Sequence, residues 1–376
     1  MLSDHLQRRR ITRRALLRSA FLGGSGLFAA QMLGCGDNGG DGTAATATRP
    51  ALDLPGPTST PAPSPTPQVL RWERLAPSGA LPTARRDQSM VSDGKRVYVF
   101  GGRNGDAGDL NDLWTFDLKA GTWTEVAAAD GPSPRHGHNA AWDTDRGRMV
   151  IFGGQQGDAF FNDTWAFEPP GGAWSQLSTG APTPQPRYGA GAALVPGGLF
   201  FVTHGFTDQG RFDDSWQFDF SQDTWTSISP NGDRPIKRCL MRSAWDPGRE
   251  RLLLFAGQTD GTPFLDDLWA LTPNGWQQID FETGPNARHF YAMVFDDLGN
   301  KLVLFGGNSE SGPLGDLWYL DALSDTWRQP SAENEGPSPR YGHEAVWVPE
   351  RRTMYLFGGT DGSNEMNDLW ALSVPV

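Results

Sequence analysis

The sequence predicts an all-β fold in which six copies of one four-stranded unit stand around an axis as the blades of a propeller. The first observation is an acidic, apolar, tryptophan stretch, "NDLWTF" at its first occurrence, that recurs every 49 to 53 residues. Its aspartate falls at Asp112, Asp163, Asp214, Asp267, Asp316 and Asp368. The second observation is composition: 47 glycines and 29 prolines among 376 residues favour many short strands joined by tight turns.

Three further landmarks repeat in the same rhythm. An apolar strand ends in small residues, reading "VYVFGG", "MVIFGG", "FFVTHG", "LLLFAG", "LVLFGG" and "MYLFGG". A single arginine precedes that strand in each unit, at Arg85, Arg135, Arg187, Arg238, Arg288 and Arg340. A lone tryptophan marks an outer strand, at Trp123, Trp174, Trp225, Trp276 and Trp327. These landmarks predict four strands in each unit.

On these motifs, residues 68–376 resemble a kelch-repeat β-propeller, and the whole chain resembles an exported bacterial kelch-repeat protein of the galactose-oxidase/kelch-like propellers. The third and fourth units depart slightly from the pattern, with His204 and Ala256 in place of the first glycine. The resemblance implies six blades, and it implies that partners bind on the face to which the arginines and the glycines belong.

The last unit lacks its outer-strand tryptophan, and Trp72 stands alone before the first unit. Residues Val69 to Leu75 are therefore expected to supply the missing strand, so that the N-terminal strand closes the last blade. A tryptophan on each blade fills the wedge between sheets. The aspartate of each "DxW" stretch is expected to cap a turn or to pair with an arginine.

The first 35 residues predict an export signal. Arg13 and Arg14 precede a weakly apolar run and resemble a twin-arginine motif. Residues 32–35, "MLGC", resemble a bacterial lipobox, in which Cys35 is lipidated; the alternative is a cleaved, soluble, secreted protein. Residues 36–67 form a tract rich in glycine, threonine and proline that predicts an extended, disordered tether.

Charge limits the partners. The net charge is −12, and it falls to −17 without the arginine-rich first 35 residues. A protein this acidic is not expected to bind nucleic acid or an anionic membrane surface, because like charges repel. We expect a monomer in the cell envelope, periplasmic or at the cell surface, that meets the membrane only through Cys35, and a protein or glycan ligand on one face.

The candidate ligand site is the channel mouth on the arginine face. It gathers the six arginines with histidines and tyrosines close behind them in sequence. The predicted site residues are Arg85, Arg135, His136, His138, Arg187, Tyr188, His204, Arg238, Arg288, His289, Tyr291, Arg340, Tyr341 and His343. Free arginines would favour an acidic glycan or a carboxylate-bearing peptide, bound more tightly as histidines gain protons near pH 6. The alternative is that the arginines only hold the blades together.

No cofactor or metal is expected, and no catalytic residue can be assigned. His136 and His138 form an HxH pair without an obvious third ligand, and no phosphate loop, nucleophile elbow or zinc signature occurs. A binding protein is the favoured reading. The alternative is a carbohydrate-active enzyme that resembles the exported, six-bladed sialate mutarotases, or a lyase. A buried carboxyl group beside an arginine at the channel, with a raised pKa, would favour the enzyme.

Overall fold

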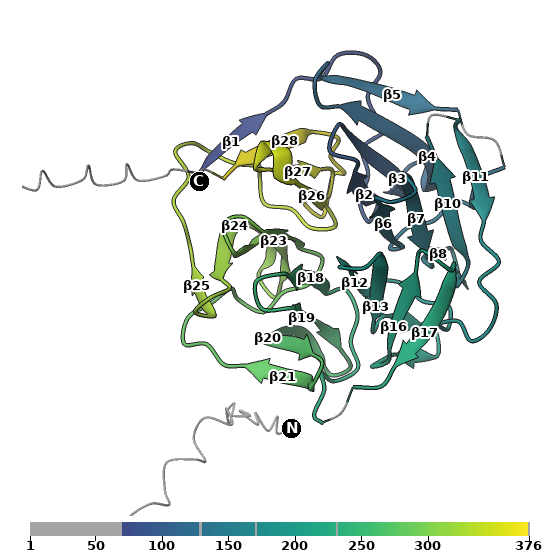
Figure 1. The fold of residues 1–376 in the computed structure, drawn as a ribbon. Helices are drawn as coiled ribbons and strands as arrows, with labels where there is room; N and C mark the ends of the chain where they lie inside the picture. Colours follow the sequence, from purple (N-terminus) through teal and green to yellow (C-terminus); the bar gives the residue numbers. More distant parts are fainter. Residues whose placement is uncertain (1–69, 128–129, 170, 231, 375–376) are drawn as a thin grey trace, which may run out of the picture. The chain divides into compact units, whose positions relative to one another are not determined.

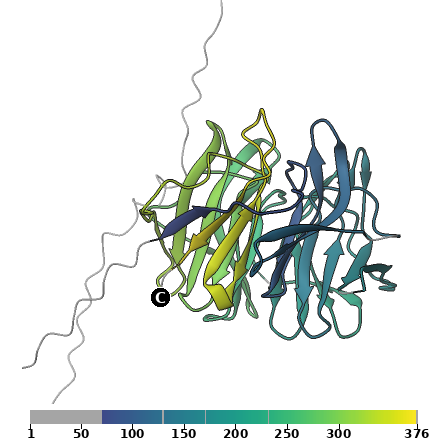
Figure 2. The same ribbon diagram turned by 90° about the horizontal axis from the view of Figure 1, so that it is seen from above.

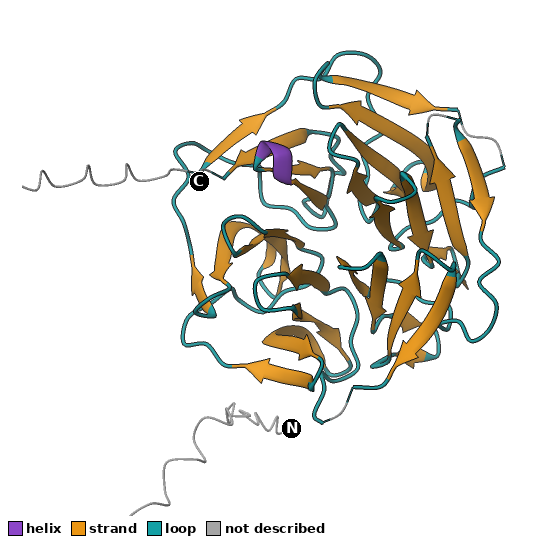
Figure 3. Ribbon diagram, in the orientation of Figure 1, coloured by secondary structure: helices purple, strands orange, loops and turns teal. Residues whose placement is uncertain are grey.

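Six four-stranded antiparallel sheets stand around a common axis (Figure 1). The structure, a computed structural model, describes residues 70–127, 130–169, 171–230 and 232–374. The predicted signal and tether segments lie outside the described residues. The prediction of an all-β, six-bladed propeller is confirmed. The helical content of the described chain is the single 3₁₀ turn η2 (Pro349–Arg351), drawn in purple in Figure 3.

Each blade is numbered in chain order and contains four strands from the axis outward. The first strands are β2 (Ser89–Ser92), β6 (Asn139–Asp143), β12 (Gly191–Val195), β18 (Arg242–Asp246), β22 (Ala292–Asp296) and β26 (Glu344–Val348). The second strands are β3 (Arg96–Asn104), β7 (Arg148–Phe152), β13 (Leu199–Thr203), β19 (Arg251–Thr259), β23 (Lys301–Ser309) and β27 (Thr353–Phe357).

The third strands, which hold the "DxW" tryptophans, are β4 (Gly108–Asp117), β10 (Thr164–Glu168), β16 (Ser215–Asp219), β20 (Thr262–Thr272), β24 (Gly312–Asp321) and β28 (Leu369–Ser373). The fourth strands are β5 (Thr122–Val126), β11 (Ala173–Gln176), β17 (Thr224–Ile228), β21 (Gly275–Ile279), β25 (Thr326–Arg328) and, in blade 6, β1 (Arg71–Arg74). Two short hairpins complete blades 2 and 3: β8 (Gln155–Gln156) with β9 (Ala159–Phe160), and β14 (Phe206–Thr207) with β15 (Gly210–Arg211).

The first strands line the axis as a closed cycle. Each contacts the first strand of the next blade, and β26 of blade 6 contacts β2 of blade 1. Because successive strands are antiparallel, the two ends of the blades differ. We call the end that holds the landmark arginines and the hairpins between second and third strands the upper face. The lower face holds the turns between first and second strands and between third and fourth strands.

The ring closes as the sequence predicts. Strand β1 pairs antiparallel with β28, with Trp72 opposite Leu372. Figures 1 and 2 show β1, in purple, beside the yellow strands of blade 6. The backbone N–H of Leu75 also donates to the carbonyl of Leu369, at 2.9 Å. Both ends of the propeller sequence thus build one sheet, and no blade edge is left unpaired at the seam.

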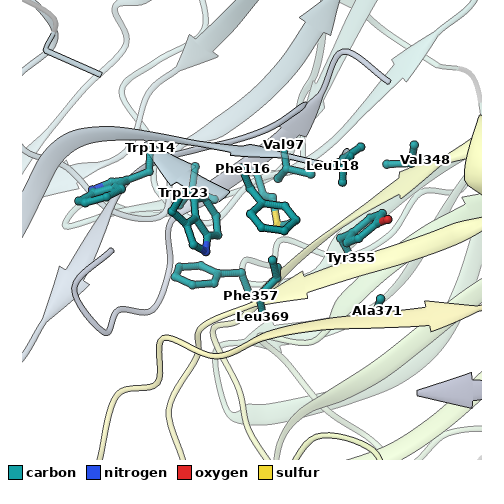
Figure 4. Close-up of a cluster of buried hydrophobic side chains, with 12 residues drawn as sticks. Val97, Trp114, Phe116, Leu118, Trp123, Val348, Tyr355, Phe357, Leu369 and Ala371 are labelled. Carbon is teal, nitrogen blue, oxygen red and sulfur yellow. The ribbon is translucent and has the colours of Figure 1, made fainter. Parts of the chain in front are cut away.

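Apolar side chains fill the space between neighbouring blades in six clusters, one at each blade-to-blade interface. Figure 4 shows the cluster between blades 1 and 6, where Trp123 of blade 1 lies against Phe357 of blade 6. The same contact joins Trp174 to Phe100 across the next interface, with 4.8 Å between ring centroids. The tryptophan of each outer strand is therefore a wedge that packs on the preceding blade, as the repeat predicts.

Among the residues that the structure describes, no helix is long and apolar enough to span a bilayer.

Candidate functional site

The landmark arginines form one repeated unit with the "DxW" aspartates. In blade 2, Arg135 donates from both terminal nitrogens to Asp163, at 2.6 and 2.9 Å, and also to the carbonyl of Gly153, at 2.9 Å. The indole N–H of Trp165 donates to the same carboxylate, at 2.7 Å. The unit recurs in all six blades, with closest N–O distances of 2.6 or 2.7 Å, in Arg85–Asp112, Arg135–Asp163, Arg187–Asp214, Arg238–Asp267, Arg288–Asp316 and Arg340–Asp368.

Each unit joins three parts of one blade: the segment before the first strand, the end of the second strand and the start of the third. Burial works against ionisation of these carboxyl groups, but the hydrogen bonds and charge of the arginine outweigh it. The pKa of Asp112, Asp214, Asp316 and Asp368 therefore lies below its usual value.

The six arginines are not available to a ligand. Their exposed fractions are 0 or 1%. The Nε–H of each also donates to the carbonyl of the residue two positions earlier, for example Arg288 to Asn286 at 2.9 Å. This corrects the expectation that they contact a ligand at the channel mouth: their charge is neutralised and their donors are engaged inside the blade. The alternative reading, that the arginines are part of the scaffold, is the one that the geometry supports.

Four other predicted site residues are buried between blades, namely His138, His204, Tyr291 and His343. His138 Nε2 lies 2.8 Å from Ser89 Oγ of blade 1, and His343 Nε2 donates to the carbonyl of Phe305 at 3.1 Å. The expectation that these four side chains face the channel mouth is corrected in the same way, because neighbouring blades cover them.

His204 and Tyr291 have defined structural partners. His204 lies edge-on to Trp276, with 6.3 Å between ring centroids, and its Nδ1 lies 2.7 Å from the hydroxyl of Thr203. The hydroxyl of Tyr291 accepts from the backbone N–H of Arg242, at 3.0 Å, and donates to the carbonyl of Phe255. The unusual histidine of the third unit is thus part of an interface between blades.

Burial also decides the charge of the histidines. It lowers the pKa of His204 and of His343 to about 3, and that of His289 to about 4. Burial lowers the pKa of His138 well below its ordinary value, too. These four rings stay neutral at pH 6, so the expected gain of protons there does not apply to them.

Four predicted residues remain on the upper face around the mouth: Tyr188 and Tyr341 are partly exposed, whereas His136 and His289 are buried beneath their neighbours. The Nδ1 atom of His136 lies 2.8 Å from Asp109, and its ring stands edge-on to Tyr188 at 5.3 Å. His289 stacks on Phe264, with centroids 4.9 Å apart and planes at 7°.

The sequence reasoning missed two aromatic residues beside them, Phe264 and Phe290. Phe290 stands edge-on to His289 at 5.1 Å and lies 6.0 Å from the ring of Tyr341. Tyr188, Phe264, Phe290 and Tyr341 are all partly exposed. They form a discontinuous aromatic surface on the upper face, contributed by blades 3 to 6.

A ring of six backbone hydrogen bonds narrows the channel at the upper face. It is formed by the residue two positions after each arginine: Asp87, Gly137, Gly189, Leu240, Phe290 and Gly342. The backbone N–H of each residue donates to the backbone carbonyl of the equivalent residue in the preceding blade, with N–O distances of 2.7 to 3.0 Å. The N–H of Asp87 in blade 1 donates to the carbonyl of Gly342 in blade 6, which completes the ring.

All six residues have φ between 55° and 66°. At position 137 glycine is also required for steric reasons, because the Cβ of any other residue would lie 2.0 Å from the ring of Tyr188. The cavity at the centre of the ring measures about 10 Å³, roughly the space that one water molecule needs.

Below this ring the channel holds charged groups that the sequence reasoning also missed. Arg242 of blade 4 donates to Glu344 of blade 6 at 2.6 Å, although the two blades are not neighbours. Burial raises the pKa of Glu344 to about 7, and the Arg242 guanidinium partly opposes that rise. Burial raises the pKa of Asp87 as well, and the nearby Arg86 guanidinium partly opposes that rise. The sequence does carry a signal for the pair of Arg242 and Glu344. The fourth position after the landmark arginine holds an arginine in blade 4 and a glutamate in blade 6.

The described residues contain no group of three or more His, Cys, Asp or Glu side chains that could hold a metal ion. Cys239 is a free, buried thiol, and burial raises its pKa to about 11, so its thiolate is not accessible at neutral pH.

Six blades, a buried Arg–Asp–Trp unit in each and closure by an N-terminal strand define a repeat propeller. Residues 66–249 and 231–375 match the family model described as the KLHDC2/KLHL20/DRC7 Kelch-repeats domain. The chain belongs to the kelch-repeat family, and kelch propellers typically bind protein partners.

Three similar proteins show the range of relatives. The chain is 28% identical over 323 residues to the leucine-zipper-like transcriptional regulator 1 homolog of Drosophila melanogaster, covering 80% of this chain and 32% of that protein. It is 28% identical over 312 residues to Kelch domain-containing protein 10 of Xenopus tropicalis, covering 74 and 72%. It is 26% identical over 328 residues to the putative adagio-like protein 2 of Oryza sativa subsp. japonica, covering 81 and 43%. The chain thus spans about a third of the first relative and most of the second.

Proposed function

We propose that this chain is an exported, envelope-anchored kelch propeller that binds a protein partner through its upper face. The observation that carries the proposal is the partly exposed aromatic surface of Tyr188, Phe264, Phe290 and Tyr341 around a mouth that the backbone ring has narrowed. Aromatic side chains supply much of the energy of protein interfaces because they bury large areas with few rotatable bonds. A narrow mouth favours a partner that lies across the face.

An acidic glycan or peptide was the ligand expected from free arginines. With those arginines paired inside the blades, the proposal retains a ligand at the upper face but no longer draws its charge from them. A protein segment fits the aromatic surface and agrees with the family.

A set of matched variants tests the proposal. Tyr188→Ala, Phe290→Ala and Tyr341→Ala are combined, and proteins retained from an envelope fraction are compared with those retained by the wild type. The control combines Leu194→Ala, Leu298→Ala and Leu323→Ala, three exposed side chains (43, 64 and 61%) of the lower face. We expect the upper-face variant to lose specific partners and the control to keep them. The reverse pattern would move the binding surface to the other end of the propeller.

The envelope location is tested separately. Replacing Arg13 and Arg14 by lysine is expected to hold the precursor in the cytoplasm, and Cys35→Ala is expected to release the exported protein from the membrane fraction. Normal export of the double-lysine variant would reject the twin-arginine route, and unchanged membrane association of Cys35→Ala would reject the lipid anchor.

Glu344 supports a second candidate, the carbohydrate-active enzyme. It is a partly buried carboxyl group beside Arg242, and its pKa is raised to about 7, which suits proton transfer near neutral pH. The test is the rate at which sialic acid anomers interconvert, followed by NMR. If the protein is such an enzyme, the wild type accelerates this interconversion, and Glu344→Gln reduces the accelerated rate at least about 100-fold. No acceleration by the wild type rejects this candidate.

A further inference from the structure

The six upper-face hairpins share a feature that the arginine pattern does not explain: each has an acidic residue at its tip. All six are exposed. They are Asp106, Asp158, Asp208, Asp260, Glu310 and Asp361. The hairpins come from six different blades, so their tips surround the channel mouth. An acidic residue at the same place in every blade produces a ring of negative charge on one end of the propeller.

Few cations oppose this ring. The hairpin segments 103–110, 155–161, 206–212, 258–265, 308–314 and 360–366 together hold eight carboxyl groups and two arginines, Arg103 and Arg211. Arg211 pairs with Asp260. Arg86, next to the mouth, pairs with Glu365 at 3.0 Å. The six landmark arginines are already neutralised by their own aspartates, so the hairpins themselves are net acidic.

A second, independent observation lies at the centre of the ring. Asp87 is 7% exposed, and its Oδ1 atom has no hydrogen-bond partner. Its other carboxylate oxygen lies 3.6 Å from Nε of Arg86. Asp87 lines the small cavity at the mouth together with Tyr188, Leu240 and Phe290. A buried acceptor without a donor costs free energy unless a ligand or water satisfies it.

We infer that the partner presents a basic segment, rich in lysine or arginine, which lies across the upper face between the acidic tips and places apolar or aromatic side chains against Tyr188, Phe290 and Tyr341. The inference rests on the proposed function and names the chemistry of the partner. The acidic tips attract and orient the basic segment, a role that complementary charges commonly have at interfaces. The aromatic surface supplies contact area.

The test uses the full-length protein and two labelled peptides, one of six Lys-Gly repeats and one of six Glu-Gly repeats, with binding followed by fluorescence anisotropy. An upper-face variant combines Asp106→Asn, Asp158→Asn, Asp208→Asn and Asp361→Asn. A lower-face variant of equal net charge combines Asp145→Asn, Glu168→Gln, Glu250→Gln and Glu350→Gln, all exposed positions.

We expect the basic peptide to bind the wild type, and the upper-face variant to bind it at least about tenfold more weakly, while the lower-face variant stays within about twofold. Binding should weaken between about 50 mM and about 300 mM salt because exposed charges are screened. Equal losses in the two variants would overturn the inference, since the attraction would then follow net charge alone. Tighter binding of the acidic peptide, or no binding of the basic one, would overturn it too.

The two proposals fail in different ways. If the aromatic upper-face variant loses partners while neutral hairpin tips change nothing, the interaction surface stands and the basic partner is rejected. If neither set of changes affects binding of any partner, the upper face itself is rejected.

Discussion

Two blade interfaces built to one plan differ in the aromatic partner of the wedge tryptophan and in the size of the apolar cluster around it. Between blades 5 and 6, Trp72 packs on Phe305 with 5.1 Å between centroids, in a cluster of eleven buried apolar residues. Between blades 3 and 4, Trp276 meets His204 at 6.3 Å, in a cluster of six. Thr203 stands where the other blades have phenylalanine, and the imidazole of His204 takes up the space.

The wedge position therefore tolerates variation in the aromatic partner of the tryptophan. The tryptophan needs a flat partner from the preceding blade, and a neutral histidine held by Thr203 meets that need. Packing against Trp276 therefore explains why the third unit has His204 where most other units have glycine.

Removing the closing strand should have the largest effect. Deleting residues 1–75 removes Trp72 and exposes the edge of β28, whereas deleting residues 1–67 leaves β1 in place. We expect the longer deletion to lower the free energy of unfolding by several kcal/mol, on the order of a core tryptophan plus a lost strand pairing. Thermal and urea unfolding measure it. Equal stability of the two truncated proteins would contradict closure by β1.

Breaking an Arg–Asp–Trp unit should cost nearly as much in either region. Arg187→Met in blade 3 and Arg288→Met in blade 5 each leave a carboxylate without its partner, and we expect losses of about 3–5 kcal/mol. The double variant Arg288→Met with Asp316→Leu should recover part of that loss, because no unpaired charge remains. If the single variants unfold like the wild type, the unit does not contribute to stability.

Truncating the wedge tryptophans compares the two interfaces directly. We expect Trp72→Ala to cost about 3–5 kcal/mol and Trp276→Ala to fall at the lower end of that range, since Trp72 also contacts Trp370. Urea unfolding of both variants checks the order. A larger loss for Trp276→Ala would mean that the interface with histidine depends more strongly on its tryptophan.

Acid should weaken the interface of blades 3 and 4 through His204. Its pKa is lowered to about 3 in the folded protein. The unfolded chain, with a pKa near the ordinary value of about 6.5, takes up a proton first as pH falls. Stability is therefore full above about pH 6.5 and declines towards pH 3, by about 2 kcal/mol at pH 5 for one such histidine.

His204→Phe should retain the aromatic contact and remove that portion of the decline. Unfolding at pH 7 and pH 5 gives the comparison, and NMR of the ring protons should show no titration of His204 above pH 5 in the folded wild type. An identical decline in the variant would assign the acid sensitivity to other groups.

Sequence reasoning located the blades, the closing strand and the tryptophan wedges because each depends on side chains that recur at a fixed spacing. The pairing of each "DxW" aspartate with an arginine was also among its expectations. The acidic hairpin tips, two to four residues after each second glycine, were readable in the same way.

Other features have no periodic signal. The backbone ring at the mouth is built from Asp87, Leu240 and Phe290 as well as from three glycines, since carbonyl and N–H groups make it. The pair of Arg242 and Glu344 joins residues 102 positions apart on blades that are not neighbours. Neither follows from comparing one repeat with the next.

The periodic residues specify the six-bladed β-propeller, because every blade must satisfy the same local contacts with the same side chains. Which of those residues a ligand can reach depends on how the blades pack against one another. The arginines could have been a positive ring or buried supports. Burial settles the matter, because a guanidinium group enclosed in protein must be paired, and in blade 2 its aspartate lies 28 residues further along the chain, just before the third strand.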